Sequence, residues 1–144
     1  MKIAVIHGPN LRLLGQREPE VYGTDTLDDV HRKLEEVAAD LGAELETFQS
    51  NHEGALLDYI EDAAQRVSGF LINPGAFTHT SIALRDALVG VDRPFVEVHL
   101  SNTAGRERFR RHSYLSGVAA GVVYGFGVQS YLLGLRGLIG RLDG

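Results

Sequence analysis

Short apolar runs alternate along this chain with stretches in which apolar residues recur every three or four positions. The apolar runs predict five β-strands, at residues 3–7, 44–49, 70–72, 94–100 and 119–124. The helical spacing predicts helices at residues 26–41, 56–67, 81–89 and from 127 onward. Because strands joined through helices form right-handed crossovers, this alternation predicts a parallel sheet that is covered by helices on both faces.

The length of the chain narrows the choice of parallel α/β fold. For 144 residues we predict a flavodoxin-like three-layer sandwich, whose five-stranded parallel sheet has the strand order 2-1-3-4-5. The chain has no internal repeat, low-complexity segment or linker, so residues 1–144 are expected to form a single flavodoxin-like domain. There is no signal-peptide pattern and no apolar stretch of about 20 residues, so we expect a soluble, cytoplasmic protein.

Polar segments follow each of the first four predicted strands. They are Gly8-Pro-Asn10, Ser50-Asn-His-Glu-Gly54, Asn73-Pro-Gly75 and His99-Leu-Ser-Asn102. In open α/β sheets, ligands bind outside the carboxyl ends of the strands. These four segments, which are far apart in the sequence, are therefore expected to converge on one site at that edge of the sheet.

Composition limits the chemistry of this site. The 14 basic and 19 acidic residues give a net charge of −5, which argues against a general nucleic-acid binder. Without cysteine, the chain has no disulfide, thiolate metal site or cysteine nucleophile. Lysine occurs only at Lys2 and Lys33, and neither is near a motif, so Schiff-base chemistry is disfavoured. The arginines suit an anionic ligand.

The connection between the first predicted strand and the first predicted helix is long. It runs from Gly8 to Asp25, whereas such connections usually have about 2–6 residues. We interpret it as a lid that excludes water, although a variable surface excursion would have the same length. The lid contains Arg17 and Tyr22. A guanidinium beside a phenol favours the phenolate, so this pair is a candidate base.

Glu97 and His99 lie two residues apart on the fourth predicted strand, so their side chains share one face. A carboxylate beside an imidazole fixes its tautomer and stabilises its protonated form, as is typical of a general acid. An antiparallel edge strand facing solvent would alternate in the same way. The position at the end of a presumed central strand favours the functional interpretation.

The segment from Asn73 to Ser81 predicts a turn that leads into a helix N-terminus, where backbone N–H groups attract an anion. Thr80 or Ser81 is expected to cap that helix, whereas His79 has no capping role and is a candidate ligand contact. Four arginines crowd a later connection, and one or two of them are expected to hold a carboxylate. These four are Arg106, Arg108, Arg110 and Arg111.

Two other interpretations stay open at this point. In the first, His52, Glu53, His79, Glu97 and His99 form the metal site of a hydrolase, although no compact motif such as HExxH is present. The second is a non-catalytic module of the same fold that binds small anions. The first turn lacks the glycine-rich phosphate motifs that would support it.

Several longer motifs occur in order along the chain. They are Gly8-Pro-Asn-Leu, Leu14-Gly, Arg17-Glu-Pro, Tyr22-Gly, Gln49-Ser-Asn-His-Glu-Gly54, Asn73-Pro-Gly-Ala76, Thr78-His-Thr-Ser81, Ala83-Leu-Arg-Asp-Ala87 and Glu97-Val-His-Leu-Ser-Asn102. Together these motifs resemble the type II 3-dehydroquinate dehydratases, with the spacings of that family from the first strand into the last helix.

The resemblance implies the reversible dehydration of 3-dehydroquinate to 3-dehydroshikimate, a step of aromatic amino acid biosynthesis that needs no metal and no cofactor. It implies an anti elimination through an enolate, with Tyr22 as the base and Arg17 assisting it. His99, oriented by Glu97, would be the acid. Asn10 would help to hold a water on the enolate oxygen.

The resemblance also implies substrate-binding residues and an assembly. The matching positions are Asn73, His79, Leu100, Ser101, Arg106 and Arg110. Asp86 matches a position that reaches into a neighbouring subunit's site, because the family forms dodecamers that are tetramers of trimers. The chain departs from the family pattern at His7, where asparagine is common, at Arg12 in the lid, and at Thr103-Ala104-Gly105.

Overall fold

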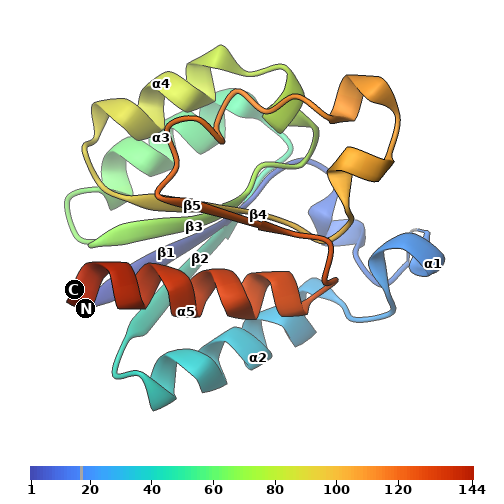
Figure 1. The fold of residues 1–144 in the computed structure, drawn as a ribbon. Coiled ribbons are helices and arrows are strands. Elements are labelled where there is room, and N and C mark those ends of the chain that lie inside the picture. Colours follow the sequence, from blue (N-terminus) through green and yellow to red (C-terminus); the bar gives the residue numbers. More distant parts are fainter. Residues whose placement is uncertain (17) are drawn as a thin grey trace.

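A computed structural model describes residues 1–16 and 18–144 and shows a three-layer α/β sandwich (Figure 1). Its five strands form one sheet in the order β2-β1-β3-β4-β5, and every neighbouring pair is parallel. The strands are β1 (Lys2–His7), β2 (Glu44–Gln49), β3 (Gly69–Asn73), β4 (Phe95–His99) and β5 (Gly121–Tyr124). The predicted flavodoxin-like sheet and its strand order are confirmed.

Helices cover both faces of this sheet (Figure 1). On one face lie α2 (Leu27–Asp40) and α5 (Gln129–Asp143), and on the other lie α3 (Glu53–Ala63) and α4 (Ile82–Gly90). Each face of the sheet has its own hydrophobic core, and alternate residues of β1 point into the two cores. Ile3 and Val5 pack on the α2/α5 side, whereas Ala4 and Ile6 pack on the α3/α4 side. No helix within the described part of the chain is long and apolar enough to cross a membrane.

Side-chain caps explain where two of the helices begin. The Thr26 hydroxyl accepts a hydrogen bond from the backbone N–H of Asp29, and the Asp29 carboxylate accepts one from the backbone N–H of Thr26, so α2 starts with a capping box. Ser81, rather than Thr80, caps α4 by accepting from the backbone N–H of Leu84 at 2.9 Å.

The connections after β1, β3 and β4 contain short helices of their own. The long connection after β1 contains a 3₁₀ helix (Leu11–Leu13) and the short helix α1 (Pro19–Tyr22). A 3₁₀ helix (Gly75–His79) also follows β3 and leads into the N-terminus of α4, where Ser81 is the N-cap, as the sequence predicted. Two further 3₁₀ helices, Thr103–Gly105 and Arg108–Arg110, follow β4.

Candidate active site

The loops after β1 and β3 interlock at the carboxyl edge of the sheet. The backbone N–H of Gly8 donates to the carbonyl of Asn73 at 2.8 Å. A Cβ atom on Gly8 would lie 2.2 Å from the carbonyl oxygen of Pro74, so only glycine fits there. Gly75 has a φ of +59° and packs against Pro9, where a side chain would also be strained. This close approach brings the two loops together at the edge of one pocket.

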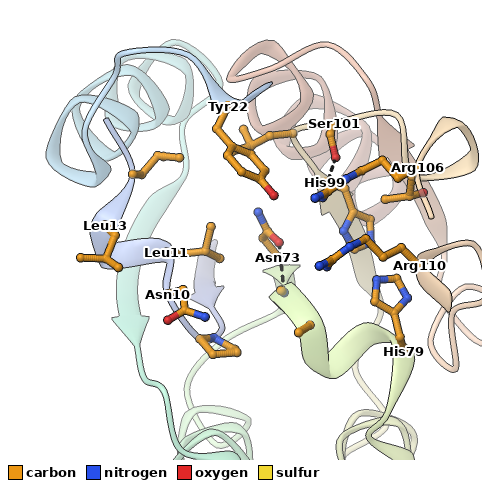
Figure 2. A pocket seen from close by; sticks show the side chains of 16 residues that line it. Asn10, Leu11, Leu13, Tyr22, Asn73, His79, His99, Ser101, Arg106 and Arg110 are labelled. Atoms are coloured by element: carbon orange, nitrogen blue, oxygen red, sulfur yellow. Dashed lines mark hydrogen bonds between the residues drawn. The ribbon is translucent and has the colours of Figure 1, made fainter. Parts of the chain in front are cut away.

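The pocket lies where the chain leaves β1, β3 and β4, with α1 above it (Figure 2). Its cavity measures about 190 Å³. It is lined by Pro9, Asn10, Leu11, Leu13, Leu14, Tyr22, Asn73, Gly75, Ala76, His79, His99, Leu100, Ser101, Thr103, Arg106 and Arg110. Three of the four polar segments singled out in the sequence contribute to it, because the carboxyl ends of parallel strands meet at one edge.

Most of the candidate residues share this pocket. Those that line it are Asn10, Tyr22, Asn73, His79, His99, Leu100, Ser101, Arg106 and Arg110. Glu97 lies behind His99, and Asp86 lies on α4, where it pairs with Arg85 and does not line the pocket of its own chain. Arg17 lies outside the described residues.

Glu97 and His99 form a buried pair. His99 Nε2 lies 2.5 Å from Glu97 Oε2, and the two residues are only 7% and 1% exposed. Because a carboxylate oxygen accepts, Nε2 carries the proton, and Nδ1 is the ring nitrogen left for a ligand. The alternative of an antiparallel edge strand is wrong, since β4 is parallel and lies between β3 and β5.

Neighbouring side chains stabilise the negative charge of the Glu97 carboxylate. Burial raises the pKa of this carboxyl, but the hydrogen bond and charge of His99 and the hydroxyls of Ser116 and Ser113 outweigh it and hold the pKa below its usual value. Ser116 Oγ and Ser113 Oγ donate to Glu97 Oε1 at 2.8 and 3.0 Å. Glu97 is therefore an anion that can stabilise positive charge on the ring of His99.

His79 supplies a neutral ring to the same wall. Its Nδ1 lies 2.7 Å from the backbone carbonyl of His112 and must donate to it, so Nε2 of the neutral ring is an acceptor. Burial lowers the pKa of His79, and the positive charges of His99 and Arg110 lower it further, against the raising effect of the His112 carbonyl. The pocket thus presents a hydrogen-bond acceptor at this position.

Two of the four candidate arginines line the pocket, and the other two are exposed. The Arg106 guanidinium lies 5.6 Å from the centre of the Tyr22 ring, and its Nη1 donates to Ser101 Oγ at 3.4 Å. Arg110 Nε donates to Glu107 at 2.8 Å. Figure 2 shows both guanidinium groups on the same side of the pocket as His99. This side can hold a carboxylate by paired hydrogen bonds.

The alternative metal site is not assembled. Among the described residues, no group of three or more histidine, aspartate or glutamate side chains is placed to hold a metal ion. Of the five residues suggested, Glu53 instead accepts a hydrogen bond from Ser81 Oγ, and His52 precedes the first turn of α3.

Some functional neighbours could not be found in the sequence. Ser113 and Ser116 reach Glu97 from a connection without regular structure, and nothing in their spacing signals it. The apolar wall made by Leu11 and Leu13 lies in a 3₁₀ helix of the lid. Its only sequence signal was the leucine-rich run inside an otherwise polar connection.

Fold and pocket together define an α/β protein with a buried carboxylate–imidazole pair and two arginines at the carboxyl edge of a parallel sheet. A sequence model of the family described as dehydroquinase class II matches residues 1–139. The chain belongs to this family. The resemblance stated on the motifs alone is confirmed.

Curated relatives and solved structures agree with this assignment. The chain is 60% identical over 142 residues to the 3-dehydroquinate dehydratase of Polynucleobacter asymbioticus, covering 98% of this chain and 95% of the relative. It is 59% identical over 129 residues to the catabolic 3-dehydroquinase of Aspergillus oryzae, covering 90% and 84%. The crystal structure of the type II dehydroquinase from Butyrivibrio crossotus superposes with a TM-score of 0.92 at 41% identity, covering 100% and 98%.

Proposed function

We propose that this protein is a hydro-lyase that converts 3-dehydroquinate to 3-dehydroshikimate, reversibly and by anti elimination through an enolate. Family membership and the names of the relatives support the substrate and the reaction. The observation that carries the proposal is the buried Glu97–His99 pair, which faces a pocket that also contains Tyr22. A module that only binds anions has no need for a buried carboxylate–imidazole pair, so this alternative is not favoured.

Tyr22 acts as the base in this proposal. Its phenolate oxygen takes the proton from the carbon next to the ketone, and the electron pair of the broken C–H bond forms the enolate. Figure 2 shows the Tyr22 hydroxyl directed into the pocket, towards Asn73 and His99. Arg17 assists the phenolate on the strength of the family motif. Asn10 helps to hold a water that stabilises the enolate oxygen.

His99 acts as the acid. Its ring donates a proton to the departing hydroxyl, which leaves as water while the enolate collapses to the conjugated enone. Glu97 holds the ring through Nε2 and stabilises the imidazolium before the proton is given up. In this scheme Glu97 acts through His99, which explains why its carboxylate is buried directly behind the His99 ring and does not contact the substrate.

The rest of the pocket binds the substrate. The proposed contacts are Asn73, His79, Leu100, Ser101, Arg106 and Arg110. The arginines suit the carboxylate of the substrate, and the acceptor nitrogen of His79 suits one of its hydroxyl groups. These parts need neither a metal nor a cofactor, and we propose that the single domain of residues 1–144 works without either.

We also propose a dodecamer, a tetramer of trimers, in which Asp86 of a neighbouring subunit completes the site. A second hollow of about 360 Å³ adjoins the pocket and shares the wall formed by His79, His99 and Arg110. Apolar Val122 and Tyr124 of β5 line it, at the edge of the sheet. The carboxylate of Asp86 from a neighbouring subunit would lie near the guanidinium of Arg110 in this hollow. Light scattering at micromolar concentration tests the assembly, and a monomer contradicts the role given to Asp86.

We propose that the protein works in the cytoplasm. There it would catalyse a step of the shikimate pathway, which leads to the aromatic amino acids. One relative is named 3-dehydroquinate dehydratase, and another of similar identity is named catabolic 3-dehydroquinase. Quinate breakdown is therefore the competing role for the same reaction. Growth of a strain that lacks the gene separates them. Dependence on added aromatic amino acids supports biosynthesis, whereas failure only on quinate as carbon source supports breakdown.

The deciding experiment follows ultraviolet absorbance after 3-dehydroquinate is added to metal-stripped protein. The product is a conjugated enone and the substrate is not. A rise that persists with chelator and borohydride supports elimination without a metal or a Schiff base. Loss of the rise with chelator contradicts metal independence, and no rise from folded protein moves the function to the anion-binding module.

Replacement of Tyr22 tests the base. Tyr22→Phe is expected to lower kcat by roughly 10²-fold or more with the fold retained, because phenylalanine cannot accept a proton. Tyr59→Phe is the matched control, since its hydroxyl bonds to Glu46 at the far edge of the sheet. Near-normal turnover of Tyr22→Phe, or an equal loss in Tyr59→Phe, contradicts the assignment.

A further inference from the structure

One of the four polar segments predicted to converge on the pocket does not line it. This segment, residues 50–54, follows β2 and lies wholly within the described part of the chain. Its Asn51 side chain instead contacts the backbone of Asn10, which does line the pocket. The side chain of Gln49, the last residue of β2, contacts both Asn51 and Gly8. The segment therefore reaches the pocket through the loop after β1.

Three hydrogen bonds connect these side chains with that loop. Oδ1 of Asn51 accepts from the backbone N–H of Asn10 at 3.0 Å. Nε2 of Gln49 donates to the backbone carbonyl of Gly8 at 3.1 Å and to Oδ1 of Asn51 at 3.2 Å. The oxygen of Asn51 thus accepts two hydrogen bonds, and the nitrogen of Gln49 donates two. Together they hold the loop at both ends of residues 8–10.

The backbone groups determine the orientation of both amides. A backbone N–H can only donate, so the N–H of Asn10 must meet the oxygen of Asn51. A backbone carbonyl can only accept, so the carbonyl of Gly8 must meet the nitrogen of Gln49. A flipped amide at either position would lose its bond to the loop. Asn51 therefore acts as an acceptor and Gln49 as a donor.

The backbone of Asn10 has a conformation that needs support. Its φ is 69° and its ψ is −2°, in the left-handed region that is unfavourable for residues with a side chain. The carbonyl of Asn10 accepts from the N–H of Leu13 at 3.0 Å, and its N–H is held by Asn51. The peptide groups on both sides of Asn10 are therefore fixed, and with them the direction in which its side chain leaves the backbone.

The need to satisfy a backbone N–H does not by itself account for Asn51. Asn10 is exposed, so water could accept from its N–H at little cost in free energy. A water molecule would not fix the position of that N–H, whereas the Asn51 oxygen is itself held by Gln49. The consequence of the contact is geometric, and a displacement of about 1 Å at a reacting group can lower the rate by about 10²-fold.

We propose that Asn51 is a positioning residue, whose amide oxygen, held by Gln49, keeps Asn10 in the left-handed conformation that directs its side chain to the water on the enolate oxygen. The inference rests on the role given to Asn10 in the proposed function. Asn51 and Gln49 are both described and neither lines the pocket, so they act on the reaction only through the loop after β1. Figure 2 shows Asn10 across the pocket from His79 and Arg110, on the side that this loop forms.

The main test makes the same chemical change, amide to carboxylate, at both positions. Asn51→Asp keeps an acceptor for the N–H of Asn10 and is expected to retain kcat within about 2-fold. Gln49→Glu replaces a donor by an acceptor that faces the carbonyl of Gly8, and is expected to lower kcat about 5- to 10-fold, the value of about one hydrogen bond. Equal kcat values in the two variants, whether retained or lowered, overturn the proposal.

Removal of the acceptor tests Asn51 directly. Asn51→Ala is expected to lower kcat about 5- to 10-fold while KM stays within about 2-fold, because the water held by Asn10 acts on the enolate rather than on the bound substrate. Ser50→Ala is the matched control. The Ser50 hydroxyl also accepts from a backbone N–H, that of His52 at 2.9 Å, but this bond stays within residues 50–54. An unchanged kcat in Asn51→Ala, or an equal fall in Ser50→Ala, overturns the positioning role.

A double-mutant cycle separates this inference from the proposed function. Asn10→Gly removes the side chain but adopts the left-handed conformation freely, and is expected to lower kcat. In that background Asn51→Ala should have no further effect on kcat. The same loss in both backgrounds would mean that Asn51 acts by another route, and would overturn the inference alone. An unchanged kcat in Asn10→Gly would refute the role of Asn10 in the proposed function, and this inference with it.

Discussion

Two histidines end strands of the same sheet that are separated by β3, and their surroundings differ in charge. His7 is the last residue of β1 and is 0% exposed, and His99 is the last residue of β4 and is 7% exposed. Among the described residues, the hydrogen-bond partners of His7 are the hydroxyl of Tyr131 and the ring of His31, and neither is an anion. His99 contacts the Glu97 carboxylate at 2.5 Å.

The difference shows that the partner, rather than burial, determines what a buried histidine can do. Burial removes the water that would stabilise an imidazolium, and the charge of His31 disfavours it further, so the pKa of His7 falls to about 3. Beside Glu97, the negative charge replaces the lost water. The first environment produces a fixed hydrogen-bonding element, and the second produces a group suited to giving a proton.

The largest effect is expected from removing the ring on β4. His99→Ala should lower kcat roughly 10²-fold or more without unfolding the protein, because the variant lacks the proposed proton donor for the leaving hydroxyl. The absorbance assay and circular dichroism measure the two properties. His52→Ala, an exposed histidine before α3, is the control. Turnover close to that of the unaltered protein would refute His99 as the acid.

Neutralising the carboxylate tests the charge directly. Glu97→Gln keeps an acceptor for His99 but removes the charge that stabilises the imidazolium, so kcat should fall about 10- to 100-fold with little change in KM. Glu46→Gln is the matched control, since hydrogen bonds from Arg66 and Tyr59 lower the pKa of Glu46 to about 2 far from the pocket. Equal kcat values for the two variants would mean that the charge of Glu97 is irrelevant to turnover.

The neutral histidine should be visible in the pH dependence of stability. The folded-state pKa of His7, about 3, lies below the ordinary histidine value of 6.5, so between these values the unfolded chain binds more protons and acid favours unfolding. This contributes roughly 2 kcal/mol of lost stability between about pH 6.5 and about pH 5. Denaturant unfolding at both pH values should show a smaller loss in His7→Asn.

The control for that measurement is His52→Asn, which replaces an exposed histidine. His31, whose pKa burial also lowers, contributes a loss in the same direction, so the slope of His7→Asn should shrink but not vanish. An unchanged slope would mean that His7 is protonated in the folded protein, and the contrast between the two histidines would fail.

The smallest effect is expected at the hydroxyls behind Glu97. Ser113→Ala and Ser116→Ala each remove one hydrogen bond to Oε1 and should lower kcat about 2- to 5-fold. The double variant should approach, but not exceed, the loss in Glu97→Gln. A larger loss would assign these serines a role beyond supporting the carboxylate.

Local spacing was enough to predict much of the fold and part of the site. The period of the apolar residues marked the strands and helices, and the two-residue spacing of Glu97 and His99 placed both on one face. The rule that ligands bind at the carboxyl ends of parallel strands located the pocket. Boundaries were less accurate: α3 begins at Glu53, before its first apolar residue, and β5 begins at Gly121 rather than at residue 119.

Only the tertiary structure decided which distant groups meet. His7 and Tyr131 are 124 positions apart, and His7 and His31 are 24 apart, so no local pattern joins them. The same holds for the His112 carbonyl that sets the tautomer of His79. Periodicity determines which face a side chain occupies, because it depends on backbone geometry alone. The partner and the protonation state of a buried group depend on what excludes water from it, and that is determined only when the layers pack.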